Sequence, residues 1–425
     1  MEPKKRSIRR KRKSKKGKII IKLFIIAFIL IVCHEIFENF LSSITNNIEE
    51  NIDNSSVQNI VINEDKNEEK ADEQKVIVED SHIKLNVIGD IMCHNTQYMD
   101  AYNAASQTYD FSYVFDDVKE ATSKSDVFIG NLETTFAGKE RGYSNYPNFN
   151  TPEQLAYDLK GMGIDILTTA NNHCMDTGYT GLERTLDFLD DAQIEHTGTN
   201  RSKEEQNTIL VKEINGIKIA FLSFTYGTNG IGISSDKDYA VNLIGEDLIL
   251  SQIKLAQKES PDLICASIHW GIEYQNIQND EQEKWADFLI SNGVNIILGS
   301  HPHVLQPMEI REVKLENGEI RKGFVIYSMG NFMSGQTQKN THTSIILNLD
   351  ITKNGENSEI FVDNVSYIPI YTYKGTGNKK YKVLNIEKAV EKYESGEDKS
   401  IGESNYNLFK EEINRINEMM TIKNS

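Results

Sequence analysis

The sequence of 425 residues has only 4 cysteines, and this scarcity limits the class of protein. Cys33 lies in an apolar run, while Cys93, Cys174 and Cys265 each lie in or beside a strand-end motif, without the spacing of a disulfide framework or zinc knuckle. Three is also an odd number, so these three cannot form a complete disulfide set. We expect them to be small buried packing residues.

The sequence also lacks positive charge outside its first residues. Residues 1–18 carry eleven Lys and Arg against Glu2, a net charge of +10, so the formal charge of −17 leaves −27 (−17 minus +10) for the remainder. An acidic body argues against nucleic acid as the main partner, because a phosphate backbone requires a basic surface. The sequence contains neither an internal repeat nor a glycine-rich phosphate loop.

The basic head precedes an apolar run, IIIKLFIIAFILIVC, in which Lys22 is the one charged residue. The run is short for a bilayer span of roughly 20 residues, but Lys22 can snorkel and the following HEIFENFL can extend the helix. A cleaved signal peptide and a buried core helix are the alternatives. No small-residue cleavage site follows, and a core helix needs no flanking cations. We predict a cytoplasmic head at 1–18, a retained signal anchor at 19–41 and an extracellular main domain.

The segment after the predicted anchor is polar and nearly free of aromatic residues. Residues 42–82 are rich in Asn, Asp, Glu and Lys, so they cannot bury enough apolar area to offset the entropy of ordering, and we predict a flexible acidic stalk. Beyond it we predict one main domain at 83–375 and a polar helical extension at 376–425.

Short β-rich runs alternate with amphipathic helical stretches in the first part of the main domain. The runs are IKLNVIGD, DVFIGNLE, IDILTTANNH, IKIAFLSFTY, DLICASIHWG and VNIILGSHPH. This alternation predicts an α/β fold with a mostly parallel, buried sheet covered by helices. After residue 310, Asn-Gly pairs at 317–318 and 354–355 separate alternating strands and predict β-hairpins.

Residues that can bind metal fall where the predicted strands end. They are Asp90 and His94, Asn131 and Glu133, Asn172, His173 and Asp176, His269 and Glu273, and His301 and His303. In a parallel sheet the carboxyl ends open on one side, so these motifs are expected to converge there. Imidazole, carboxylate and amide donors without clustered thiolates favour Mn, Fe, Zn or Mg, bound as one or two ions.

Each of these residues also has an ordinary explanation. A histidine at a strand end is often a hydrogen-bonded structural residue. Asp90 can be a turn or helix-cap residue, and Asn172 can be an ordinary turn residue. His94 can be a local loop residue, and Asp176 and Glu273 can orient histidines rather than bind metal. The coincidence of five such motifs at five strand ends favours a common site.

Six motifs carry a resemblance to a known family. GDIMCHNTQ, GNLETTF, NNHCMDTG, IHWGIEY, GSHPHVLQ and YSMGNF occur in this order between about residues 83 and 335, and the chain resembles the CapA-type proteins of poly-γ-glutamate capsule biosynthesis. That family is similar to the calcineurin-like metallophosphoesterases. The resemblance implies a two-sheet sandwich flanked by helices.

The resemblance also implies roles for individual residues. His173 matches a catalytic histidine that contacts substrate phosphate, and Asn131, Asp176, Glu273 and Asn331 are expected to orient ligands or contact substrate. The implied metal ligands are Asp90, His94, Glu133, Asn172, His269, His301 and His303. The phosphoesterase pattern Asp-x-His is here Asp90-x-x-x-His94, and Gly-Asp-x-x-Asp is here GNLET, so either the first metal pocket is altered or one ion binds more tightly.

Together these features predict a membrane-anchored surface protein that acts in making or exporting poly-γ-glutamate. We expect a metal-dependent hydrolase or transferase whose substrate is an anionic polymer or a phosphoryl compound, in contact with a membrane synthase complex. A non-catalytic, metal-stabilised scaffold or polymer-binding module is the alternative. A plain adhesin-like domain is a third possibility and predicts that no metal is bound.

Overall fold

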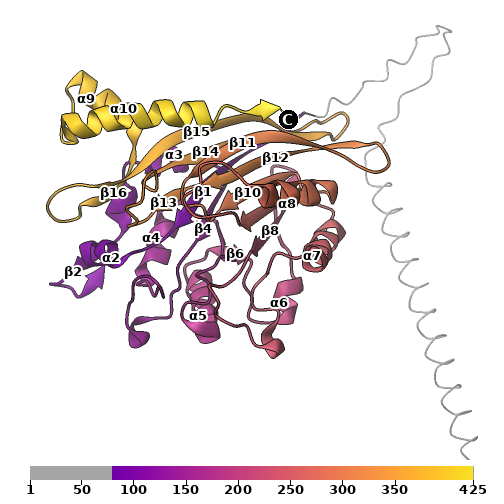
Figure 1. Cartoon of the computed structure of the whole chain (residues 1–425), viewed down its shortest axis with the longest axis horizontal. Helices are drawn as coiled ribbons and strands as arrows, with labels where there is room; N and C mark the ends of the chain where they lie inside the picture. The colour runs from indigo at the N-terminus through magenta and orange to yellow at the C-terminus, as the bar shows by residue number, and fades with distance from the viewer. Residues whose placement is uncertain (1–78, 425) are drawn as a thin grey trace, which may run out of the picture. The chain divides into compact units, whose positions relative to one another are not determined.

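The computed structural model describes residues 79–424, which build two mixed β-sheets (Figure 1). The first sheet contains eight strands, and β13 (Asn331–Met333) joins it by pairing with β1. Its other strands, in spatial order, are β16 (Tyr381–Asn385), β15 (Ile360–Lys374), β14 (Thr343–Lys353), β1 (Ser81–Ile91), β4 (Val127–Leu132), β5 (Ile166–Thr168) and β6 (Glu195–Thr197).

The second sheet contains seven strands and holds the middle of the chain. In spatial order they are β17 (Lys423–Asn424), β11 (Leu305–Lys314), β12 (Ile320–Met329), β10 (Ile296–Ser300), β9 (Leu263–His269), β8 (Ile217–Thr225) and β7 (Leu210–Ile214). A small hairpin, β2 (Tyr102–Asn103) with β3 (Thr108–Tyr109), lies outside both sheets.

Helices connect most of these strands. They are α2 (Asn95–Ala101), α3 (Lys119–Thr122), α4 (Gln154–Met162), α5 (Gly178–Asp191), α6 (Lys203–Asn207), α7 (Glu246–Lys258), α8 (Asp280–Ser291), α9 (Ile386–Ser395) and α10 (Gly402–Met419), with 3₁₀ turns at η1 (Ser112–Phe115), η2 (Lys139–Arg141) and η3 (Ser235–Lys237). Local chemistry explains their ends. Asn279 and Gln282 form a capping box at the start of α8, and Gly163 ends α4 in the left-handed conformation.

Three apolar cores arrange the sheets as a sandwich with helices outside. Successive residues of a strand point to opposite faces, so Phe221 of β8 packs in the core between the sheets while Ala220 and Leu222 pack outward against α7 and α8. In the same way Val87 of β1 faces the central core and Ile88 faces α4 and α5. Because both faces of these strands are covered, apolar residues occur on both faces of each strand.

The α/β prediction is confirmed, with one difference in how the strands are distributed. The strands β1, β4, β5 and β6 pair in parallel, as do β8, β9 and β10, but they form two sheets, as the family resemblance implies, where the alternation of runs alone predicted one. The pattern of apolar residues indicates that a strand is buried on both faces, but it does not indicate which strand is its neighbour. Both Asn-Gly hairpins are confirmed, between β11 and β12 and between β14 and β15.

The C-terminal segment contributes to both sheets. The boundary predicted at residue 376 lies between β15 and β16, and the segment beyond it supplies β16 and β17 as well as the expected helices. In Figure 1, α9 and α10 (yellow) run along the long strands β15 and β11. Phe409 and Ile416 of α10 are buried in the core that also fills the space between the sheets.

The head at 1–18 and the anchor at 19–41 lie outside the described residues, as does most of the 42–82 stalk. At the stalk's end, β1 already begins at Ser81. Among residues 79–424, none of the helices combines the length and the apolar character that a bilayer crossing requires.

A close backbone approach at Gly89 gives a first prediction, because it sets the position of Asp90. A Cβ atom at Gly89 would lie 1.9 Å from the carbonyl oxygen of Gly330, which is backbone and cannot rotate away. We expect Gly89→Ala to lower the free energy of unfolding by about 3 kcal/mol. Urea denaturation of the full-length chain measures this. Gly161→Ala is the control, since a Cβ there meets nothing within 4 Å. Equal losses in the two variants would contradict the prediction.

Candidate metal centre

The carboxyl ends of strands from both sheets meet at one place. Asp90 of β1 and Asn131 of β4 are paired in register in the first sheet, and His269 of β9 is paired with Ser300 of β10 in the second. Contacts cross between the sheets, since His303 Nδ1 lies 3.1 Å from Asp90 Oδ2. The convergence expected at a common sheet edge therefore occurs across a sandwich rather than within one sheet.

The turn after β10 carries two histidines in an uncommon backbone conformation. His301 has φ 97° and His303 has φ 58°, both in the region that L residues rarely adopt. Such strain costs about 1–3 kcal/mol per residue and persists where the surroundings hold it. Their ring centroids are 5.9 Å apart, with Pro302 between them in the chain. The turn thus directs two neighbouring imidazoles to different parts of one site.

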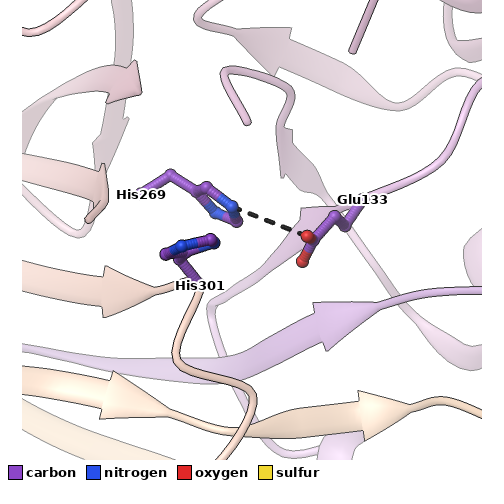
Figure 2. A group of neighbouring side chains, drawn as sticks. All are labelled: Glu133, His269 and His301. Carbon is purple, nitrogen blue, oxygen red and sulfur yellow. Dashed lines mark ion pairs between the residues drawn. The ribbon is translucent and has the colours of Figure 1, made fainter. Parts of the chain in front are cut away.

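Three side chains form the first group of potential ligands: Glu133, His269 and His301, whose ligand atoms lie within 4.8 Å of one another. Figure 2 shows these three side chains pointing toward one another, with His269 Nε2 3.5 Å from Glu133 Oε1. Asn172 adds an amide oxygen 2.8 Å from His269 Nε2. Its amide NH₂ donates to Asn229, which fixes the oxygen toward the histidine. The group therefore offers four donors.

A second group shares one member with the first. Asp90, Glu133 and His303 also have ligand atoms within 4.8 Å of one another. His303 Nε2 lies 3.7 Å from Glu133 Oε1, so the Glu133 carboxylate lies between the two groups. A third group is formed by Glu273 with His301 and His303. Glu133 could therefore hold an ion in either of the first two groups.

The buried polar atoms of this site fit a divalent cation. Both carboxylate oxygens of Glu133 are buried without a hydrogen-bond partner, and so is Nδ1 of His301. Leaving such atoms unpaired is costly, so buried carboxylates are normally paired or bind metal. Burial, together with neighbouring Asp90, raises the pKa of Glu133 well above its usual value. The residues present thus fit one or two ions of the Mn, Fe, Zn or Mg class.

Two imidazoles of the site, those of His269 and His301, are neutral at physiological pH. Burial, followed by the charges of His301 and His303, lowers the pKa of His269 well below its usual value. Burial and then His303 lower the pKa of His301 to about 3. A neutral imidazole keeps a lone pair for metal binding, whereas a protonated one does not.

His173 lies beside the cluster but belongs to none of the three groups. Its Nδ1 is 2.7 Å from Asp176 Oδ2, which also accepts a hydrogen bond from the backbone N–H of Phe149. The ring packs edge-on against Phe149, with centroids 4.9 Å apart. With Nδ1 held by the carboxylate, Nε2 is the atom available to a substrate. The geometry agrees with the orienting role predicted for Asp176.

The other predicted residues have distinct positions. Asn131 donates to Asp90 Oδ1 at 2.8 Å, and Asn331 Oδ1 lies 3.1 Å from His303 Nδ1, so both contact candidate ligands. His94, predicted as a ligand, lies outside all three groups. It precedes α2, and its Nδ1 accepts a hydrogen bond from the backbone N–H of Gly335. The structure therefore fits the alternative that His94 is a local loop residue better than the prediction that it binds metal.

Three tyrosines that the sequence analysis did not select surround the histidines. Tyr226 is 49% exposed with its ring centroid 4.6 Å from that of His301, while Tyr274 and Tyr146 lie 6.2 Å from His303 and His173. Tyr274 ends the IHWGIEY motif and Tyr226 ends the run IKIAFLSFTY, but the residues selected at these places were those that bind metal. Tyr226 directly follows β8, and the rule of strand ends that selected the other residues would have found it.

Residues 84–336 match the family described as bacterial capsule synthesis protein PGA_cap. The capsule biosynthesis protein CapA of Bacillus anthracis is 27% identical over 288 residues, covering 65% of this chain and 66% of that protein. The PGA biosynthesis protein CapA of Bacillus subtilis (strain 168) is 29% identical over 290 residues, covering 67% and 72%. The calcineurin-like phosphoesterase YfkN from Bacillus subtilis aligns with TM-score 0.40 and 15% identity, covering 68% of this chain and 90% of that chain.

Proposed function

This chain belongs to the bacterial capsule synthesis protein PGA_cap family, and from that premise we propose that it is a membrane-anchored surface protein of poly-γ-glutamate synthesis or export. Two observations support the proposed location. The basic head at 1–18 and the apolar run that begins at Ile19 have the order of a signal anchor with a cytoplasmic N-terminus. The domain that follows is then extracellular.

The proposed activity is that of a metal-dependent hydrolase or transferase acting on phosphoryl or γ-glutamyl groups. One observation carries it: the Glu133 carboxylate is fully buried, accepts no hydrogen bond from residues 79–424 and belongs to two groups of potential ligands. A protein that used Glu133 only for packing would gain stability from an apolar residue there. A bound cation would explain why a carboxylate is buried at this point.

The chain's own residues divide the chemical work. A bound divalent ion supplies Lewis-acid polarisation and a low pKa for a bound water. His173, oriented by Asp176, presents Nε2 to hold or protonate a leaving oxygen. Asn172 and His269 are fixed against each other at 2.8 Å and hold one side of the site. The exposed ring of Tyr226 covers His301 and offers substrate an apolar face with a polar tip.

The proposed substrate is an anionic polymer or a phosphoryl compound, and the proposed partner is a membrane synthase complex. The body of the chain is strongly acidic, so attraction of an anion depends on local charge at the metal centre rather than on the general surface. A membrane anchor places the domain where a polymer leaves the cell, which favours a role next to a synthase.

A scaffold role is the second candidate, and one observation favours it. Both oxygens of Asp90 already lie near protein donors, with Asn131 Nδ2 at 2.8 Å from Oδ1 and His303 Nδ1 at 3.1 Å from Oδ2. A site that is satisfied without an ion can serve a structural purpose. In this case one tightly bound ion would stabilise a polymer-binding module without turnover.

Metal analysis of the purified full-length chain provides the first test. We expect one to two equivalents of a divalent metal per chain, and we expect chelation to lower the melting temperature. An ion present at 100 times its Kd contributes about 2.7 kcal/mol to the free energy of unfolding. Elemental analysis and differential scanning fluorimetry measure the two effects. A chain without metal that is unaffected by added Mn²⁺ or Zn²⁺ would leave only the adhesin-like alternative.

Turnover separates the two remaining candidates. The same preparation is assayed in Mn²⁺ with a generic phosphomonoester, a phosphodiester and a γ-glutamyl oligomer. Release of product from any of the three, stopped by chelation and restored by Mn²⁺, supports the enzyme. A metal-loaded chain without turnover on all three supports the scaffold.

A further inference from the structure

The segment that follows β9 is tied to the two-histidine turn through its backbone. The N–H of Trp270 donates to the carbonyl of Ser300 at 3.1 Å, and the N–H of Tyr274 donates to the carbonyl of Pro302 at 2.8 Å. Gln306 secures the segment further along, since its side-chain amide donates to the carbonyl of Gln275 at 2.8 Å. Glu273 lies between these attachment points, so its backbone position is held against His301 and His303.

Glu273 brings a carboxylate to the solvent side of the histidines. One of its oxygens and one nitrogen from each of His301 and His303 lie within 4.8 Å of one another. The two imidazoles are 4% and 1% exposed, whereas Glu273 is exposed. A carboxylate and two imidazoles within this distance match the donor set that Zn and Mn accept.

Each of the two inner groups has an amide oxygen beside it. Asn172 Oδ1 lies 2.8 Å from His269 Nε2 in the first group, and Asn331 Oδ1 lies 3.1 Å from His303 Nδ1 in the second. The third group supplies three ligands, Glu273, His301 and His303, which is the number of protein ligands that a catalytic zinc site takes beside a water. Nδ1 of His301 is in addition buried without a hydrogen-bond partner among the described residues, so this imidazole keeps a nitrogen free for a cation.

We propose that Glu273 is a metal ligand, supplied from the loop after β9, that completes the centre together with His301 and His303. The inference rests on the proposed metal-dependent function and adds to it the residue that closes the solvent side. A ligand on a loop at the mouth of the site is able to leave when substrate arrives, while the buried ligands stay in place. Glu273 then controls how firmly the more exposed ion is held.

Metal titration of full-length variants tests this inference. Mn²⁺ and Zn²⁺ affinity and stoichiometry are measured by calorimetry and by competition with a chromophoric chelator. For Glu273→Gln we expect the weaker ion to bind roughly 10- to 100-fold less tightly, with the other ion unchanged. Glu281→Gln, an exposed acid at the start of α8 outside all three groups, is the matched control and should bind metal like the parent chain.

A charge-retaining variant separates ligation from general electrostatic attraction. Glu273→Asp keeps the charge but withdraws the oxygens, so a ligand role predicts weakened binding that persists at 0.5 M salt. A long-range role predicts parent-like binding for Glu273→Asp and a loss in Glu273→Gln that disappears with salt, and this result would overturn the proposal. Unchanged binding in Glu273→Gln would also overturn it while leaving the proposed function intact. Absence of metal binding by the parent chain would overturn both.

Discussion

Replacement of Glu133 by glutamine should abolish binding of divalent metal and, at the same time, make the metal-free protein more stable. The first effect follows because Glu133 is common to two groups of ligands, so one substitution replaces the anionic oxygen donor of each group by the weaker oxygen of a neutral amide. The second follows because its carboxylate oxygens are buried without hydrogen-bond partners. Relieving an unpaired buried charge should raise the free energy of unfolding of the metal-free chain by about 1–3 kcal/mol.

The stabilisation by Glu133→Gln should depend on pH with a defined sign. Burial raises the pKa of Glu133, so the folded metal-free protein binds its proton more tightly than the unfolded chain does. The stability of the metal-free parent therefore falls as the pH rises from about 4.3, the value for an unperturbed glutamate, through the higher folded pKa. The advantage of Glu133→Gln should be smallest in acid and largest at neutral pH. Chelator-treated samples in a pH series of thermal melts measure it.

Glu309 offers a matched control for this experiment. It is also buried, but its Oε1 accepts hydrogen bonds from Tyr327 at 2.7 Å and Arg311 at 2.9 Å. Glu309→Gln should destabilise the chain and leave metal binding unchanged, the opposite pattern on both counts. If Glu133→Gln retained metal, or if both variants were destabilised alike, the interpretation of Glu133 as a bridging ligand would be wrong.

Replacement of His173 by alanine should remove turnover while leaving the metal in place. His173 lies outside the three groups of potential ligands. Asp176 binds Nδ1 of its ring, so Nε2 points away from the contact between His173 and Asp176. A positioned acid of this kind contributes about 10²- to 10⁴-fold to a rate. We expect a loss of that size in kcat on whichever substrate the parent chain hydrolyses, with unchanged metal content. Asp176→Asn should retain the imidazole and lose less.

A His–Asp pair with an exposed aspartate serves as the control for His173. His196 Nε2 lies 3.2 Å from Asp190 Oδ1, and neither residue belongs to the groups of potential ligands. His196→Ala should leave turnover per folded molecule unchanged. A loss of metal in His173→Ala would instead identify His173 as a ligand, and retention of full activity would exclude it from the chemistry.

The convergence of the site was predictable because it depends on a local rule. Asp90, His269 and His301 each lie at or directly after the end of an apolar β-run, and chain direction alone sets which end of a strand that is. The two Asn-Gly hairpins depend on turn chemistry that is equally local. The rule does not depend on which sheet a strand joins. The predicted convergence of these residues therefore holds although the strands form two sheets.

Features that depend on distant partners could not be predicted in the same way. His94 follows Asp90 closely enough to suggest ligation, but its Nδ1 is bonded to Gly335, a residue 241 positions away in the sequence. The pairing of β17 with β11 likewise cannot be predicted from the sequence, because a strand of two residues is too short to show a hydrophobic period. Glu273 was recognised as a candidate, but its closeness to His301 and His303 depends on the backbone bond from Tyr274 to Pro302.

The distribution of the ligands over both sheets has a consequence for the order of events during biogenesis. Asp90 and His303 touch although 213 positions separate them in the sequence. A chain that is still being synthesised therefore has no complete pocket until the second half of the sandwich has docked on the first. Under the proposed function, metal would be acquired only after this docking, and the ion would then join two halves that were synthesised far apart in time.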